Sequence, residues 1–232
     1  MQSPKLPRNG AMPALTFSRP LAIVGGGHVD PALLHELAGR DVALVGADGG
    51  ADTIGAAGLV PEAIIGDLDS LADRSAWEGR TRILDIGEQL TTDFQKALYS
   101  TSAPVTLALG MTGKRLDHTL AALSAVQQTA AERSVMLVDE VDLALAISGT
   151  FRFESAEGER ISVHPFSPIR FRTSQGLRYS LDDLLLEPMG RLGTSNAGLG
   201  GQVEIVPEDT TPWLLILDRG RLWDLIEIFQ KV

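Results

Sequence analysis

The first 140 residues alternate short apolar runs with segments of helical spacing, and this alternation limits the possible folds more than any other feature. Strands that alternate with helices form parallel sheets whose faces are covered by those helices. We therefore predict an α/β region with a parallel sheet. Six runs have the length and residue types of strands, at 21–24, 42–45, 63–65, 82–86, 105–109 and 135–138.

The segments between these runs have helical spacing. Pro31 begins one of them, leucines follow at near-helical intervals, and Gly39 ends it, as expected for a helix with proline in its first turn and glycine at its end. Apolar residues at 94–98 and the leucines at 116, 120 and 123 form two more stripes. We expect each stripe to be the buried face of a helix.

Near residue 140 the pattern changes to loosely alternating runs separated by Gly, Pro and Ser. Such runs, at 149–154, 160–164, 169–172, 202–205 and 214–217, are typical of a small antiparallel sandwich. The expected organisation is a loose lead-in at 1–18, an α/β domain at 19–140 and an all-β sandwich domain at 141–232. The stretch 221–232 fits either a helix or a strand.

Composition excludes several classes of function. Thirty acidic against twenty basic residues give a net charge of -10, so a nucleic acid or an anionic membrane surface is not an expected partner. The chain has no cysteine, which excludes disulfides, thiol catalysis and Cys-bound metal. With no signal-like segment and no apolar run long enough to span a membrane, we expect a cytoplasmic protein.

Two carboxylates follow the third apolar run in the sequence PEAIIGDLDS. Asp67 and Asp69 are two residues apart, so in extended chain both side chains project to the same side. Oxygen ligands at the end of a parallel strand suit Mg²⁺. The alternative is an ordinary loop in which an aspartate caps the next helix.

Two further segments combine polar residues with predicted helix starts. Thr92 and Asp93 begin a helix, where they either cap it or face a phosphate and a metal ion. In GMTGKRLDH, glycines and the basic residues Lys114 and Arg115 could accept phosphate, although this segment is not a Walker A loop. A plain surface loop is the alternative.

Taken together, the acidic residues favour a metal site. Five aspartates follow predicted strands or begin predicted helices within the α/β half: Asp48, Asp67, Asp69, Asp93 and Asp117. Carboxylates gathered on one sheet edge repel each other unless a cation neutralises them.

The ordered motifs ADGGAD, GDLDS, TTDFQKAL, GMTGKRLDH and GTSN resemble those of thiamin pyrophosphokinases, over most of the chain. This resemblance implies an α/β domain followed by a β-sandwich, and a homodimer with active sites between subunits. It also implies transfer of the terminal pyrophosphoryl group of ATP, the co-substrate, to the hydroxyl of thiamin with Mg²⁺, giving thiamin diphosphate and AMP.

Roles for individual residues follow from the same resemblance. The metal–ATP complex would be held by Asp67, Asp69 and Asp93, which are the expected catalytic and metal-binding residues. Further ATP contacts would come from Asp48, Gly49, Gln89, Thr92, Lys114, Arg115 and Asp117. Thiamin would meet Tyr179, Ser195 and Asn196 of the partner chain.

Two positions depart from the family pattern. Leu90 stands where a polar or acidic residue is common, and Ala122 stands where many members have asparagine. Two alternatives stay open, of which the departures motivate the first, while the intact Asp67, Asp69 and Asp93 count against the second. One is a pyrophosphokinase for another hydroxymethyl heterocycle, such as a pterin, and the other is a catalytically weak regulator that binds nucleotide or thiamin.

Overall fold

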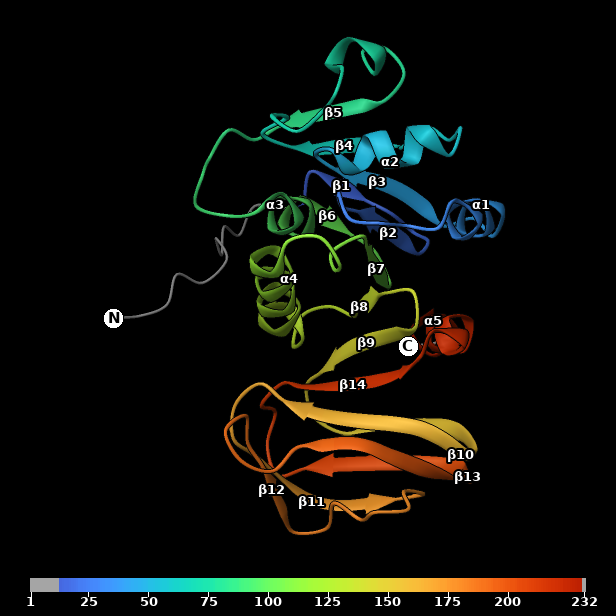
Figure 1. The fold of residues 1–232 in the computed structure, drawn as a ribbon, viewed down its shortest axis with the longest axis vertical. Helices are drawn as coiled ribbons and strands as arrows, with labels where there is room; N and C mark the ends of the chain where they lie inside the picture. The colour runs from blue at the N-terminus through green and yellow to red at the C-terminus, as the bar shows by residue number, and fades with distance from the viewer. Residues whose placement is uncertain (1–12, 231–232) are drawn as a thin grey trace.

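One hydrogen-bonded sheet of twelve strands runs through residues 13–230, which are the residues that the computed structural model describes (Figure 1). Its order is β12-β11-β13-β10-β14-β9-β8-β7-β2-β3-β4-β5. The half from β8 to β5 is parallel, and the half from β9 to β12 is antiparallel. This confirms the predicted succession of an α/β region and an all-β antiparallel region.

The parallel half contains all six predicted strands, with ends that differ by at most two residues. These strands are largely buried because helices cover both faces of the sheet, which explains their continuous apolar runs. They are β2 (Leu21–Val24), β3 (Ala43–Ala47), β4 (Ala63–Gly66), β5 (Arg82–Asp85), β7 (Thr106–Leu109) and β8 (Val135–Val138).

Alternate residues of β2 pack against two different pairs of helices, one on each face of the sheet. Leu21 and Ile23 belong to one core cluster with α3 (Asp93–Ser100) and α4 (Leu116–Thr129). Ala22 and Val24 belong to another with α1 (Pro31–Gly39) and with Ile54 of α2 (Gly50–Ala56). Because successive strand side chains point to opposite faces, the sheet is covered on both sides.

The buried face of α4 differs from the predicted leucine stripe. Leu116 and Leu120 are exposed, at 74% and 56%, whereas Ala122, Ala125 and Val126 pack on the sheet. Small side chains allow the helix to lie close to the strands, so the buried face is the one with the smaller residues. Leu123, the third leucine of the predicted stripe, is half-buried and packs against this core. Helical spacing therefore predicted the helix correctly, but its buried face wrongly at two of the three leucines.

The antiparallel half begins where β9 pairs with β8, so the two halves share one sheet. Residues 151–154 of one predicted run and the whole of the run 160–164 belong to one long strand, β10. The domain boundary at 140/141 stays a prediction. The strands are β9 (Asp142–Ile147), β10 (Phe151–Pro165), β11 (Ile169–Gln175), β12 (Leu184–Leu186), β13 (Gly193–Pro207) and β14 (Trp213–Asp218).

The last described element is a helix, α5 (Leu222–Gln230), which follows the 3-10 turn η2 (Arg219–Arg221). Of the two conformations that the sequence allowed for this stretch, the helix is the one formed. Trp223 of α5 contacts α1: its indole N–H donates to Glu36 Oε1 at 2.7 Å, and the Arg40 guanidinium lies 4.2 Å from its ring centre. The end of the antiparallel half is thus attached to the α/β half.

Three short elements complete the fold. Of the expected lead-in 1–18, residues 1–12 lie outside the described residues, and β1 (Leu15–Thr16) pairs with β6 (Thr101–Ser102). The 3-10 turn η1 (Arg74–Ala76) lies between β4 and β5.

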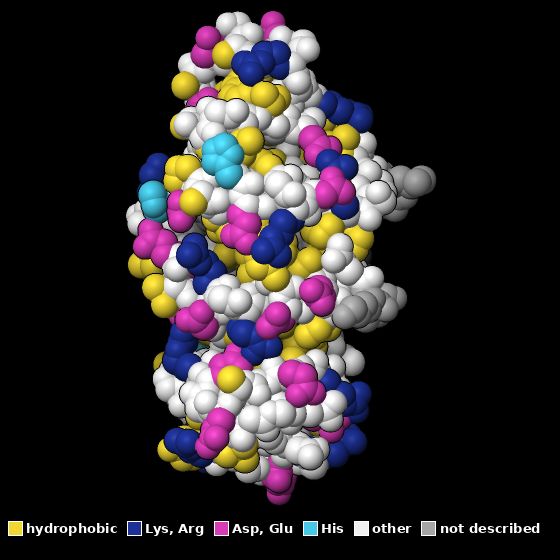
Figure 2. All heavy atoms as spheres, turned by 90° about the vertical axis from the view of Figure 1, so that its right-hand side faces the viewer, with side chains coloured by type: hydrophobic (Ala, Val, Ile, Leu, Met, Phe, Trp, Pro, Cys, Tyr) yellow, Lys and Arg dark blue, Asp and Glu magenta, His cyan; other side chains and the backbone are white. Residues whose placement is uncertain are grey.

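The surface that includes α1 and α5 carries both signs of charge. Figure 2 shows acidic and basic side chains interspersed on this face, with no continuous basic area there. Across residues 13–230, none of the helices has both the length and the apolar character that crossing a membrane requires.

Candidate functional site

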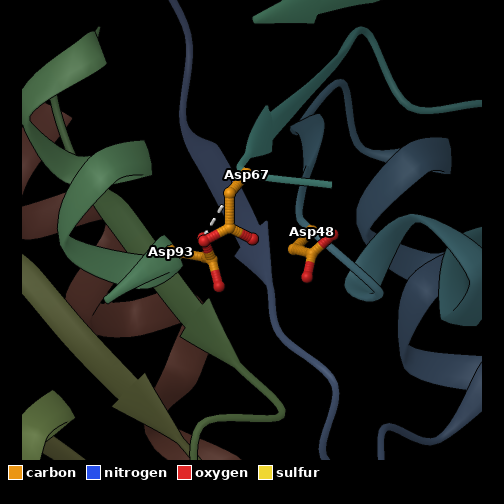
Figure 3. A group of neighbouring side chains, drawn as sticks. All are labelled: Asp48, Asp67 and Asp93. Carbon is orange, nitrogen blue, oxygen red and sulfur yellow. Dashed lines mark hydrogen bonds between the residues drawn. The ribbon is translucent and has the colours of Figure 1, made fainter. Parts of the chain in front are cut away.

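Three aspartates meet where β3 and β4 end and α3 begins. Asp48 follows β3, Asp67 follows β4, and Asp93 is the first residue of α3. One carboxylate oxygen of each lies within 4.8 Å of the others, and the three side chains point toward a common space (Figure 3). The carboxyl ends of the strands of a parallel sheet are where such folds bind ligands.

The approach of these aspartates depends on Gly66. A Cβ atom at residue 66 would lie 2.9 Å from the Cβ of Asp48 and 3.0 Å from Oδ1 of Asp93. Any larger residue would force the two carboxylates away from β4. The backbone is also unusual here, because Asp48 and Leu68 have φ of 48° and 65°, in the left-handed region that non-glycine residues seldom adopt. Such conformations gather at functional sites.

Lys96 lies between two of the aspartates, and our sequence analysis missed it. Its Nζ donates to Asp67 Oδ2 at 2.9 Å and to Asp93 Oδ1 at 3.0 Å, and the side chain is 1% exposed. Burial lowers the pKa of Lys96, but the hydrogen bonds to the two aspartates outweigh burial, and the pKa is raised. The i, i+3 spacing from Asp93 on one helix face was the signal that could have identified it.

Asp67 is held as a carboxylate by several donors. The hydrogen bond from Lys96 is the main cause of its lowered pKa, and the Gln89 side-chain amide adds another at 2.8 Å. Its own backbone N–H points to Asp93 Oδ1 at 3.4 Å. The group is therefore charged and fixed before any ligand binds.

Asp48 is the buried member of the cluster. It is 3% exposed, and burial raises its pKa, although hydrogen bonds from Ser70 oppose this. Oδ2 accepts the Ser70 N–H at 3.0 Å, whereas Oδ1 is buried with no hydrogen-bond partner among the described residues. A buried carboxylate oxygen without a donor is costly, and a metal ion would satisfy it.

Asp69, a predicted metal ligand, lies outside the group of three. It is exposed, its N–H approaches Asp67 Oδ1 at 3.4 Å, and its carboxylate accepts from the Ser70 hydroxyl at 2.9 Å. The structure thus brings Asp48 to the place beside Asp67 and Asp93 that the sequence suggested for Asp69. Its metal-binding role stays a prediction.

Thr92 caps α3. Its hydroxyl accepts the Gln95 N–H at 3.3 Å, and the Gln95 side chain accepts the Thr92 N–H at 3.0 Å, forming a capping box. The capping alternative is therefore realised. Thr92 nevertheless also lines the pocket described next, so the capped helix start faces open space.

A pocket of about 600 Å³ opens beside the aspartates. The predicted residues Asp48, Gly49, Thr92, Asp93, Lys114 and Arg115 line it, together with Gly25, Gly26 and Gly27. The glycines allow the loop after β2 to lie close to the loop after β7, since a Cβ at residue 27 would lie 2.5 Å from the carbonyl oxygen of Gly110. Its volume is in the range of small-molecule sites.

Arg115 and Asp117 pair with each other at the rim of the pocket. The Arg115 guanidinium donates to both carboxylate oxygens of Asp117, at 3.1 Å and 2.6 Å, and both side chains are exposed. An exposed pair of this kind is weak and easily exchanged for another anion.

The predicted thiamin-binding residues form a separate group. Tyr179 is 62% exposed, whereas Asn196 is 5% exposed. The Asn196 side chain accepts the Tyr179 N–H at 3.0 Å and donates to the Tyr179 carbonyl at 2.7 Å, so it fixes the backbone that presents the tyrosine ring. Ser195 has a φ of 58°, and its N–H donates to the Ser162 hydroxyl.

The clustered aspartates and the predicted thiamin-binding residues lie in different halves of the twelve-stranded sheet. Ser195 and Asn196 are on β13, which is seven strand positions from β3 in the sheet order. At the usual spacing between strands, this separation is on the order of 30 Å. Figure 1 shows β11 and β13 at the end of the molecule away from β3 and β4.

Comparison with known proteins gives a consistent result. Residues 34–138 match the family described as thiamin pyrophosphokinase, catalytic domain. Thiamine pyrophosphokinase 1 of rice, Oryza sativa subsp. japonica, is 27% identical over 176 residues. That match covers 68% of this chain and 66% of the rice protein, so the chain spans just under two thirds of that relative.

Solved structures share the fold. Thiamin pyrophosphokinase from Geobacillus thermodenitrificans has a TM-score of 0.73 at 24% identity, covering 86% of this chain and 97% of that one. The enzyme from Candida albicans has a TM-score of 0.75 at 15% identity, covering 87% and 89%. At these identities the likeness establishes the arrangement of strands and helices.

Proposed function

We propose that the chain transfers the pyrophosphoryl group of ATP to the hydroxyl of thiamin, giving thiamin diphosphate and AMP, as a member of the thiamin pyrophosphokinase family whose catalytic domain residues 34–138 match. The observation that supports this most directly is the group of Asp48, Asp67 and Asp93 beside a pocket large enough for a nucleotide.

The donor set suits Mg²⁺, which prefers oxygen ligands. Asp48, Asp67 and Asp93 would hold it, and the unpartnered Oδ1 of Asp48 is an observation that favours such an ion. Bound there, Mg²⁺ would neutralise charge on the phosphates of ATP. Three carboxylates against the one Lys96 ammonium leave a negative site among the described residues, which further favours a divalent cation.

The chain's own groups would position the nucleotide. The start of α3 at Thr92 and Asp93 faces the pocket, where a helix N-terminus favours anionic groups. Lys114 and Arg115 line the same pocket and would pair with phosphate, Arg115 after leaving Asp117. Phosphoryl-type transfer depends mainly on such positioning and charge, so no covalent intermediate on the protein is needed.

The acceptor would be bound by a second copy of the chain. Tyr179 presents an exposed ring that can stack on a flat heterocycle, but it belongs to the antiparallel half, far from the aspartates of its own chain. Transfer requires the hydroxyl and the phosphorus to meet. A homodimer that places Tyr179 and Ser195 of one protomer over the aspartates of the other satisfies this requirement, with Asn196 holding the backbone of Tyr179.

An assay with ATP, Mg²⁺ and a panel of alcohols tests the proposal. Formation of AMP that depends on thiamin, with a product heavier by two phosphoryl groups, is expected. Formation of AMP that depends on a hydroxymethylpterin instead would favour a pyrophosphokinase for another heterocycle. The departures from the family pattern at Leu90 and Ala122 motivate this alternative. Tight binding of ATP or thiamin without any turnover would favour the regulator.

A further inference from the structure

Glu88 lies outside the pocket, yet its carboxylate accepts four hydrogen bonds. Oε2 accepts the backbone N–H groups of Leu90 at 2.6 Å and Thr91 at 3.1 Å. Oε1 accepts from the Thr91 hydroxyl and from the Tyr99 hydroxyl, the latter at 3.2 Å. The Thr91 hydroxyl is the main cause of a lowered pKa for Glu88, so the group is a charged acceptor.

These bonds connect a loop to a helix. Residues 86–92 join the end of β5 to the start of α3, and Tyr99 lies near the other end of α3. Glu88 thus links the middle of the loop to a helix that is itself packed on the sheet through Phe94, Ala97 and Leu98. Charge-assisted hydrogen bonds of this kind are stronger than bonds between neutral groups.

Apolar packing holds only the first residue of this loop, Ile86, which is half-buried against the same core cluster as α3. Leu90 is 95% exposed, and Gln89 and Gly87 are also exposed. The conformation of residues 87–91 therefore depends mainly on the hydrogen bonds that Glu88 accepts. The residue next to Glu88 is Gln89, whose Nε2 donates to Asp67 Oδ2 at 2.8 Å.

We infer that Glu88 is a positioning residue, which acts by holding Gln89 against Asp67. The inference rests on the proposed function for its catalytic consequence, because Asp67 belongs to the group assigned to the metal–ATP complex. Leu90 is exposed and Thr91 is half-buried, so we expect water to replace the Glu88 carboxylate at their N–H groups and the fold to survive. Gln89 then loses its fixed backbone, and Asp67 loses one of its donors.

The first test observes Gln89 directly, without an activity measurement. In the full-length protein, the side-chain amide signals of Gln89 are assigned by NMR from their loss in Gln89→Ala. In Glu88→Ala we expect these signals to move to the positions of solvent-exposed glutamines. Glu88→Gln, which keeps one acceptor oxygen, should retain most of the wild-type shift. Glu78→Ala, an exposed glutamate beside Arg74, is the matched control and should leave the signals unchanged.

The second test is a double-mutant cycle on pyrophosphoryl transfer. Glu88→Ala should lower kcat/KM by about tenfold, the size expected when the partner of a metal ligand is lost. Glu88→Ala combined with Gln89→Ala should be no slower than Gln89→Ala alone, because both changes remove the same contact. Tyr99→Phe, which removes one donor to Glu88, should produce a smaller loss. Thermal unfolding of each variant confirms that it is folded.

Two results would overturn the inference: unchanged Gln89 amide signals in Glu88→Ala, or effects of the two substitutions that multiply in the cycle. Failure of the proposed function would be seen in a different measurement, the activity of the wild-type chain. If the wild-type chain transfers no pyrophosphoryl group, the amide signals alone decide whether Glu88 positions Gln89.

Discussion

The ammonium of Lys96 donates to Asp67 Oδ2 at 2.9 Å, and this ion pair joins α3 to the loop that follows β4. Lys96 is almost fully buried, whereas Asp67 keeps 13% of its side chain exposed. Lys96 also pairs with Asp93 on its own helix. A single buried cation therefore holds two of the three clustered carboxylates in place.

Replacing Lys96 by methionine should destabilise the protein in a way that a divalent cation reverses. The change leaves Asp67 and Asp93 without their shared cation, and we expect a loss of about 2 kcal/mol in the free energy of unfolding. This is below the cost of breaking a fully buried pair because both aspartates keep contact with water. Denaturant unfolding in EDTA and in excess Mg²⁺ measures the difference, and Mg²⁺ should restore part of the stability.

The control for this prediction is Arg74→Met. Arg74 pairs with Asp85 at 2.8 Å, but both side chains are about half exposed, so the loss should stay below about 1 kcal/mol and should not respond to Mg²⁺. A Lys96→Met protein as stable as the wild type in EDTA would contradict the account of Lys96.

Asp48→Asn should stabilise the protein at neutral pH while it removes activity. Burial raises the pKa of Asp48 above its ordinary value of 3.8, so the folded state binds this proton more tightly than the unfolded state does. The charged side chain therefore lowers stability as pH rises above 3.8. Asparagine removes the charge and tolerates the left-handed backbone at residue 48.

The measurement is the melting temperature of wild type and Asp48→Asn in EDTA across a pH series. The variant should melt at the higher temperature at pH 7, and the gain should shrink as pH falls toward 3.8. A variant that melts lower at pH 7, or a gain that is equal at all pH values, would show that Asp48 is not strained by burial.

Asp67→Asn and Asp69→Asn test whether the metal ligands are the three clustered aspartates alone or also include Asp69, which the family motif suggests. Asp67 lies in the group of three, so its loss should abolish transfer and weaken Mn²⁺ binding, because a neutral amide is a poor ligand for such ions. Asp69 matches the family motif, and its loss should also abolish transfer. Full activity in Asp67→Asn, or unchanged activity in EDTA, would refute the metal assignment. Full activity in Asp69→Asn alone would limit the ligands to the three clustered aspartates.

Some residues of the site could be predicted from the sequence, and others could not. Asp67 and Asp93 meet because one follows a strand and the other begins the helix packed on it, and both placements were visible as sequence pattern. The spacing of Lys96 from Asp93 was visible too, but its burial was not, since a lysine in a helix of mixed polarity is usually solvated. Its burial depends on how α3 lies across β3 and β4, which is tertiary packing.

The fold shows the same division between local and long-range information. Short apolar runs between helical segments predicted the parallel strands, and loosely alternating runs predicted the antiparallel region. Both kinds of run reflect local patterns of burial. Helical spacing misplaced part of the buried face of α4, since Leu116 is exposed and Ala122 is buried, which reverses the usual preference. The role of Asn196 in holding Tyr179 was equally hidden, because the two residues are 17 positions apart and meet only across the folded antiparallel half.

Mixed dimers test the shared site. Asp67→Asn chains lack a metal ligand, and Tyr179→Ala chains lack the stacking ring, so each homodimer should be nearly inactive. In a mixture after subunit exchange, one site of each mixed dimer combines an intact Asp67 with an intact Tyr179, and activity should return. A fully active monomer, shown by sedimentation at assay concentration, would contradict the shared site, as would exchange without recovery.

The most direct test of the proposed reaction offers the purified chain ATP and Mg²⁺ with equal amounts of thiamin and a neutral hydroxymethylpterin. Thiamin carries a positive thiazolium that the acidic site should favour, and added salt should raise its KM more than that of the pterin. The expected result is thiamin heavier by two phosphoryl groups, with one AMP formed for each product molecule. Efficient modification of the pterin with thiamin left unchanged, or formation of ADP in place of AMP, would contradict the proposed function.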